Sequence, residues 1–142
     1  KMSEFNAAIG LLNLKQIEEH IARCGAIDAA YRKALKDIPG IRCHAPPALE
    51  KSNYAYFPIF VECNYPLTRD QLYDKLKANG INGRRYFYPL VTELEIFKEH
   101  GPQKHDGLTS AKRVAERVIC LPIHPDLCGQ HVARIIEVIR AA

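Results

Sequence analysis

The sequence predicts an α+β sandwich: a small mixed or antiparallel sheet, covered by helices and preceded by a long N-terminal helix. Apolar residues recur at helical spacing over the first 38 residues. Beyond them, short β-branched and aromatic runs alternate with amphipathic segments, without the regular spacing of repeated strand-helix-strand units. The 142 residues, 47% of them hydrophobic, are enough for one packed core. We therefore expect a long interdomain helix over 1–38 and a small domain over 39–142.

The N-terminal helix is expected to begin at Ser3, a suitable N-cap, and to end at Pro39-Gly40, with a bend near Gly25. At 1.5 Å per residue, a helix of about 35 residues is roughly 50 Å long, whereas a compact domain of this size is under ~40 Å across. Its first turns are apolar on more than one face. We therefore expect something outside these 142 residues to pack against them.

The remaining elements are predicted from periodicity and turn residues. We expect strands over 54–62, 81–88 and 118–121, helices over 68–80, 93–100, 108–117 and 132–139, and loops at Pro46-Pro47 and over 101–107. Pro58 favours an edge position or a bulge for the first strand. Thr68 and Gln71 have the spacing of a capping box, and Gly80 ends that helix.

Composition argues against several classes of protein. The net charge is +4, and the basic residues are scattered, so we expect neither nucleic acid nor a membrane surface as a partner. No apolar run reaches the ~18 residues of a spanning helix, and the first residues do not resemble a signal peptide, so a cytoplasmic protein is expected. The 5 cysteines include no Cys-x-x-Cys pair, which predicts neither a disulfide framework nor a metal site.

The sharpest candidate for ligand binding is the segment Gly83-Arg-Arg-Tyr-Phe-Tyr-Pro89. On a strand, alternation places Arg84, Tyr86 and Tyr88 on one face. Arg85 and Phe87 then lie on the opposite face, with Phe87 in the core. Guanidinium groups bind phosphate or carboxylate, and tyrosine rings stack, so the first face suits an anionic, ring-containing ligand such as a nucleotide sugar. An edge strand with solvated arginines and packed tyrosines is an equal alternative.

Two further positions are weaker candidates. His124 lies between two prolines in a turn, where a structural histidine is the more common case. Lys1 stands at a polar helix N-terminus, whose backbone N–H groups favour anions. The sequence contains no Gly-rich phosphate loop, nucleophile elbow or zinc-protease motif. The residues by themselves therefore indicate a ligand-binding α+β domain.

The opening segment KMSEFNAAIGLLNL, Lys1 to Leu14, resembles the [KR]-M-[SN]-[ED]-x-x-A-A-x-G-x-x-x-L segment of the DegT/StrS family of pyridoxal-phosphate-dependent sugar aminotransferases. The segment AERVICLPIHP, Ala115 to Pro125, resembles the family's A-E-x-x-x-x-L-P-[LI]-[HY]-P run. Other landmarks follow in the family's order: Tyr31-Arg-x-x-Leu35, Pro39-Gly40-Ile41, Arg69-Asp-x-Leu72, Leu76-x-x-x-Gly80-Ile81 and Arg85-Tyr-x-Tyr-Pro-Leu90. The resemblance covers essentially the whole chain and implies the smaller, C-terminal domain of the type I pyridoxal-phosphate transferase fold.

The resemblance implies an enzyme that transfers an amino group from an amino-acid donor, glutamate, to a nucleotide-linked keto sugar, and that forms a homodimer. In the family, the lysine that holds pyridoxal 5'-phosphate lies in the large domain, which these residues do not include. We therefore expect the fragment to be inactive, to bind no cofactor and to contain no catalytic residue. Its expected substrate-binding residues are Lys1, Arg84, Arg85, Tyr86 and Tyr88.

The run Arg84-Arg-Tyr-Phe-Tyr-Pro-Leu90 departs from the His-Tyr-Pro sequence of many family members and looks more like members that aminate C4 of a 4-keto-6-deoxyhexose. Two alternatives from other classes stay open. The first is a non-enzymatic module that binds single-stranded nucleic acid through Arg84, Tyr86 and Tyr88, which salt-sensitive oligonucleotide binding would reveal. The second is an interaction domain that uses the first helix as its partner surface.

Overall fold

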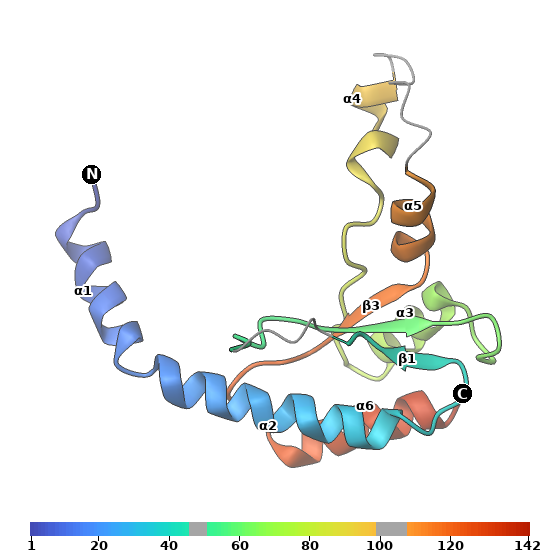
Figure 1. The fold of residues 1–142 in the computed structure, drawn as a ribbon, viewed down its shortest axis with the longest axis horizontal. Helices are drawn as coiled ribbons and strands as arrows, with labels where there is room; N and C mark the ends of the chain where they lie inside the picture. Colours follow the sequence, from blue (N-terminus) through green and yellow to red (C-terminus); the bar gives the residue numbers. More distant parts are fainter. Residues whose placement is uncertain (46–50, 99–107) are drawn as a thin grey trace.

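The computed structural model describes residues 1–45, 51–98 and 108–142 (Figure 1). The elements, in chain order, are α1 (Glu4–Leu14), α2 (Ile17–Leu35), β1 (Ile41–Cys43), β2 (Phe57–Val61), α3 (Arg69–Ala78), the 3-10 helix η1 (Val91–Glu93), α4 (Glu95–Lys98), α5 (Thr109–Ala115), β3 (Val118–Leu121) and α6 (Gly129–Arg140). The loops expected at Pro46-Pro47 and over 101–107, and the end of the helix expected over 93–100, lie outside the described residues. The predicted α+β class is confirmed.

The three strands form one antiparallel sheet in the order β1-β2-β3. Pro58 lies in the central strand and not at the edge that the sequence favoured. The position tolerates proline because it faces the end of β1. There the Pro58 carbonyl accepts the His44 N–H at 3.2 Å. The His44 carbonyl, the acceptor opposite the missing proline N–H, accepts Nη1 of Arg32 at 2.7 Å instead.

The core lies between the sheet and the pair α2 and α6, which run side by side along one face (Figure 1). Alternate residues of β2 are buried there: Phe57, Ile59 and Val61. Tyr31 of α2 packs against the Phe57 ring with 4.9 Å between centroids, and its hydroxyl donates to the Pro122 carbonyl at 3.0 Å. Because this bond satisfies the one polar atom of a fully buried side chain, burial of the Tyr31 ring stabilises the fold without the cost of an unpaired hydroxyl.

The single helix expected over residues 3–38 is in fact two helices. The chain turns at Lys15 and Gln16, whose N–H groups bond to the carbonyls of Leu12 and Asn13 three residues earlier, at 3.2 and 3.0 Å. This tighter bonding ends α1 before α2 begins, while Gly25, where the bend was expected, lies within α2. No residue of α1 is buried.

Among the described helices, none combines the length and the apolar character required to cross a bilayer.

The strand expected over 81–88 is the main error of the sequence-based prediction. Only Arg84 pairs, in an isolated bridge to Cys120 with N–H to carbonyl distances of 2.9 and 2.8 Å. Phe87 has a φ of +43°, a left-handed backbone conformation that interrupts the extended chain. The alternation of faces therefore does not hold, and Phe87 is 67% exposed where the core was expected.

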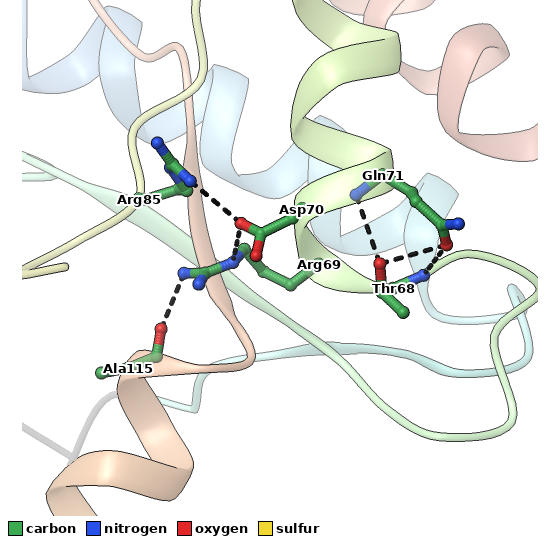
Figure 2. Close-up of polar contacts among 6 residues, drawn as sticks. All are labelled: Thr68, Arg69, Asp70, Gln71, Arg85 and Ala115. Atoms are coloured by element: carbon green, nitrogen blue, oxygen red, sulfur yellow. Dashed lines mark hydrogen bonds and ion pairs between the residues drawn. The ribbon is translucent and has the colours of Figure 1, made fainter. Parts of the chain in front are cut away.

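Several other predictions from periodicity are confirmed, whereas the strand expected over 54–62 is limited to β2, and the helix expected over 93–100 is α4, preceded by η1 and described only as far as Lys98. β3 has the predicted bounds, and α3, α5 and α6 lie over the segments predicted as helices. At the start of α3, the Thr68 hydroxyl accepts the Gln71 N–H and the Gln71 side chain accepts the Thr68 N–H, which is the predicted capping box (Figure 2). β1 was not predicted, because three residues are too few to show a period of two.

Candidate functional site

A cavity of about 920 Å³ opens where β3 ends and α6 begins. Its walls come from the two residues before β2, from the loop after α3, from the end of β3 and the loop that follows it, and from the first half of α6. The aromatic and basic side chains that line it are Tyr56, Arg84, His124, His131 and Arg134. Its lining includes no aspartate or glutamate within the described part of the chain. The cavity is therefore suited to an anionic ligand.

Arg84 is held by its backbone and keeps a free side chain. Both of its backbone groups pair with Cys120 of β3, at 2.9 and 2.8 Å. The guanidinium forms no ion pair or side-chain hydrogen bond with any described residue. Its charge acts on Cys120, where burial raises the thiol pKa to about 11 and the Arg84 charge opposes that rise. The fold thus fixes the base of Arg84 and leaves its charge available to a ligand.

Tyr86 stands beside the cavity rather than in it. Its ring centroid lies 4.9 Å from that of Tyr56, which lines the cavity, and 4.1 Å from that of Phe87. A hydrogen bond with the Tyr56 hydroxyl raises the pKa of Tyr86. The two tyrosines therefore form one aromatic wall beside the cavity.

Arg85 and Tyr88, expected on opposite faces of a strand, meet on the same side of the segment. Nη1 of Arg85 donates to Oδ1 of Asp70 at 3.1 Å (Figure 2). The Arg85 guanidinium also lies over the rings of Tyr73 and Tyr88, at 4.6 and 5.2 Å from their centroids. These contacts attach the segment to the first turns of α3 and leave Arg85 outside the cavity lining.

Arg69 is the centre of this attachment and is only 4% exposed. Its Nη1 donates to the Ala115 carbonyl at 2.7 Å (Figure 2). Its Nε lies 2.9 Å from Oδ1 of Asp70, an ion pair without hydrogen-bond geometry. Its guanidinium lies over the Tyr88 ring, 4.3 Å from the centroid. A buried cation therefore holds α3, the end of α5 and Tyr88 together.

The structure thus separates the five residues expected to bind substrate. Arg84 lines the cavity, Tyr86 borders it through Tyr56, and Arg85 and Tyr88 belong to the Arg69–Asp70 network. Lys1 lies at the free end of α1, away from the sheet, and is not brought to the cavity by this chain (Figure 1).

His124, the weaker candidate, does line the cavity. Sequence reasoning missed His131 and Arg134, which also line it. They are three residues apart on α6 and so share a helical face. The helix over 132–139 is predicted from its apolar face alone, Val132, Ile135, Ile136 and Ile139, and that pattern says nothing about the polar face. Arg69 and Asp70 were identified as part of the first turn of a helix and as a landmark of the family, but not as residues of the site.

The cofactor that the resemblance implies, pyridoxal 5'-phosphate, is held by a lysine whose amine reacts with the cofactor's aldehyde carbon. No lysine lines this cavity in the residues that the structure describes. The lining of this cavity therefore does not fit pyridoxal 5'-phosphate, and we assign no chemical step through that group to these residues. What they offer is a cavity for binding and orienting an anionic molecule.

Comparisons with known proteins agree with the fold and with the resemblance. Among curated proteins, dTDP-4-amino-4,6-dideoxy-D-glucose transaminase of Escherichia coli is 42% identical over 139 residues, 98% of this chain and 38% of the relative. The protein of the same name from Shigella dysenteriae is 39% identical over 140 residues, 99% of this chain and 38% of the relative. This chain therefore spans about 38% of the length of these curated relatives.

Among solved structures, DesI, determined in the presence of its TDP-sugar product, superposes with a TM-score of 0.89 at 32% identity, over 99% of this chain and 35% of that one. The model of the DegT/DnrJ/EryC1/StrS aminotransferase family matches residues 1–140. A match over almost the full length shows that the chain belongs to the DegT/DnrJ/EryC1/StrS aminotransferase family.

Proposed function

We propose that this chain is the C-terminal domain of an aminotransferase that moves an amino group from an amino acid, glutamate, to C4 of a nucleotide-linked keto sugar. The observation that carries the proposal is the 42% identity, over 98% of this chain, with a relative named dTDP-4-amino-4,6-dideoxy-D-glucose transaminase. The complete enzyme is a cytoplasmic homodimer whose pyridoxal 5'-phosphate, bound outside this chain, supplies the electron sink for the transfer.

Within this domain, Arg84 and the Tyr56–Tyr86 pair form the part of the wall that binds the sugar nucleotide. The unpaired guanidinium at a cavity without carboxylates supports this role for Arg84. Tyr56 and Tyr86 offer ring faces for stacking and hydroxyls for hydrogen bonds.

Arg85 and Tyr88 act as positioning residues, because their contacts with Arg69 and Asp70 anchor the segment that carries Arg84. Lys1, expected among the substrate-binding residues, is proposed to contact the diphosphate of the sugar nucleotide, which requires the rest of the enzyme. The 1–38 segment is proposed as the interdomain connection and 39–142 as the small domain.

The direct test uses the complete protein that contains this chain. Incubation with a dTDP-linked 4-keto-6-deoxyhexose and glutamate should yield the amino sugar and 2-oxoglutarate in equal amounts, measured by mass spectrometry and by a coupled assay. A reaction without the keto sugar is the control. If the complete protein consumes neither glutamate nor the keto sugar, the proposed function is wrong.

The nucleic-acid alternative requires Arg84, Tyr86 and Tyr88 on one exposed face. Tyr88 instead lies against the buried Arg69, while Arg84 lines the cavity. The arrangement favours a ligand that enters a cavity over a strand laid along a surface.

A further inference from the structure

Helix α1 is apolar and exposed. It stands away from the sheet and from the pair α2 and α6 (Figure 1), and none of its residues is buried. Large apolar side chains along it are 60–73% exposed: Phe5, Leu11, Leu12 and Leu14. An isolated helix of 11 residues is marginal in water, because most helical stability in proteins comes from the packing of an apolar face. The apolar side chains of α1 therefore mark it as a surface that another structure covers.

The residues of α1 follow a seven-residue pattern. One stripe along the helix, which we call the α1 stripe, is formed at spacings of four, three and four residues by Glu4, Ala8, Leu11 and Lys15. Lys15 belongs to it because its backbone is still helical, with φ −66° and ψ −22°. Apolar residues flank the stripe: Phe5 and Leu12 on one side, Ala7 and Leu14 on the other. The far side of the helix carries Asn6, Ile9 and Asn13. This is the pattern of a helix that packs against another helix along one seam.

The α1 stripe is complementary to itself. Its two ends carry opposite charges, and its apolar residues lie between them. In an antiparallel pair related by a two-fold axis, each end of one stripe lies against the opposite end of the other. Glu4 of one copy then meets Lys15 of the second copy, and the large Leu11 meets the small Ala8, each contact occurring twice. A parallel pair would instead place like charges together at both ends.

Both charged side chains are available for this contact. Neither Glu4 nor Lys15 forms an ion pair or a side-chain hydrogen bond with the residues that the structure describes. Both side chains are exposed, as are Ala8 and Leu11 between them. A second copy can therefore approach the whole stripe without displacing any contact listed for these side chains within the chain.

We propose that α1 is a self-association surface, and that the structure which covers it is α1 of a second copy of this chain, packed antiparallel. Leucine packing supplies most of the affinity, because exposed ion pairs contribute little. The ion pairs select the antiparallel direction, since they are attractive only in that arrangement. A second copy fits better than an unrelated partner because the stripe matches itself in charge, size and position at once.

This inference goes beyond the proposed function, which includes a homodimer but assigns no surface to it. It depends on the charge and spacing of residues within α1 and on no step of the reaction. The two can therefore fail separately, one in an association measurement on this chain and the other in an activity measurement on the complete protein.

The first test measures the association of the 142-residue chain by sedimentation equilibrium at concentrations up to about 1 mM. The wild type should form dimers and no larger species, because a two-fold contact is closed. Leu11→Gln should weaken the dimer by about tenfold or more, since it removes an apolar side chain from the seam. Ile9→Gln is the matched control on the far side of α1 and should change the dissociation constant by less than about twofold.

Charge reversal then tests the pairing itself. Glu4→Lys and Lys15→Glu each turn two attractive contacts into two repulsive ones, so each should weaken the dimer about tenfold. Lys33→Glu makes the same change of charge as Lys15→Glu on an exposed position of α2, and should have an effect of less than about twofold. The double variant, Glu4→Lys with Lys15→Glu, restores opposite charges at both contacts and should associate more tightly than either single variant.

The double variant separates pairing from an effect on the helix alone. Glu4 lies in the first turn of α1 and Lys15 at its C-cap, where both charges also favour the helix dipole. If that were their only role, the double variant would be weaker than either single variant. A double variant without rescue therefore overturns the proposal, as does a loss in Lys33→Glu equal to that in Lys15→Glu, or a wild-type chain that is monomeric at about 1 mM. If the chain dimerises as described but the complete protein does not transaminate, only the proposed function fails.

Discussion

The carboxylate of Asp70 lies 3.1 Å from the guanidinium of Arg85, fifteen residues further along the chain. The same oxygen lies 2.9 Å from Nε of the buried Arg69. One carboxylate at the start of α3 therefore holds the segment that follows Arg84, while the backbone bridge to Cys120 holds Arg84 itself. The free guanidinium of Arg84 is thus carried by a segment that is fixed on both sides.

Asp70→Asn should destabilise the domain by about 1–3 kcal/mol, because the amide cannot balance the charge of Arg69, whose side chain is buried. Asp74→Asn is the matched control on the same helix, since Asp74 is exposed and has no described ionic partner. Urea unfolding of the two variants measures the difference. Equal midpoints for Asp70→Asn and Asp74→Asn would show that the network is not stabilising.

Phe87→Ala should change the free energy of unfolding by less than about 1 kcal/mol, because the Phe87 side chain is 67% exposed. Phe57→Ala removes a ring that is 1% exposed and packed on Tyr31, and should lower stability by ~3–5 kcal/mol. Thermal unfolding of both variants compares a surface ring with a core ring. A loss of several kcal/mol in Phe87→Ala would restore the strand register predicted from the sequence.

Gly40 and Gly80 both have positive φ, +80° and +73°, but differ in the space around them. A Cβ at Gly40 would lie 2.3 Å from the backbone nitrogen of Tyr65, whereas nothing lies within 4 Å of one at Gly80. Gly80→Ala should therefore cost about 1–2 kcal/mol of backbone strain, and Gly40→Ala should cost roughly 1–3 kcal/mol more from overlap. Equal losses in chemical denaturation would mean that the Tyr65 backbone moves freely away.

The domain should lose stability in alkaline solution. Burial raises the pKa of Cys120 from 9.0 to about 11 in the folded state, so folding holds this proton more tightly than the unfolded chain does. The stabilisation is complete below pH 9 and is lost as pH rises through 11, by about 3 kcal/mol in all. Melting temperatures measured from pH 8 to 11 should fall less steeply in Cys120→Ala than in Cys63→Ala, whose thiol is exposed. If the melting temperatures of the two variants fall equally steeply with pH, the raised pKa of Cys120 does not contribute to the loss of stability.

The sequence predicts those elements whose residues express a local rule. Val132, Ile135 and Ile139 recur at helical spacing and form the buried face of α6, and the capping box at Thr68 predicts the start of α3. The break at Lys15-Gln16 was missed because both residues are good helix formers, and nothing in their identity signals a turn. The conformation of Phe87 was equally hidden, since a bulky residue rarely adopts a positive φ.

The candidate site was predicted in part, for a related reason. Arg84 was identified from its residue type, and the structure places it on the cavity. Its separation from Arg85 and Tyr88 depends on the backbone at Phe87 and on Arg69 and Asp70, which are distant in sequence. Arg134 joins Arg84 only through the packing of α6 against the sheet, so no local pattern marks the pair.

The most direct measurement is kcat/KM of the complete enzyme for a dTDP-linked 4-keto-6-deoxyhexose with glutamate as donor, in the wild type, Arg84→Ala and Arg113→Ala. Arg84 is proposed to contact the sugar nucleotide, whereas Arg113 is an unpaired arginine outside the cavity lining. We predict transamination by the wild type, a roughly 10- to 100-fold lower kcat/KM in Arg84→Ala from the loss of one charge-assisted contact, and no change in Arg113→Ala. A wild type without transaminase activity, or an Arg84→Ala variant as active as the wild type, would contradict the account.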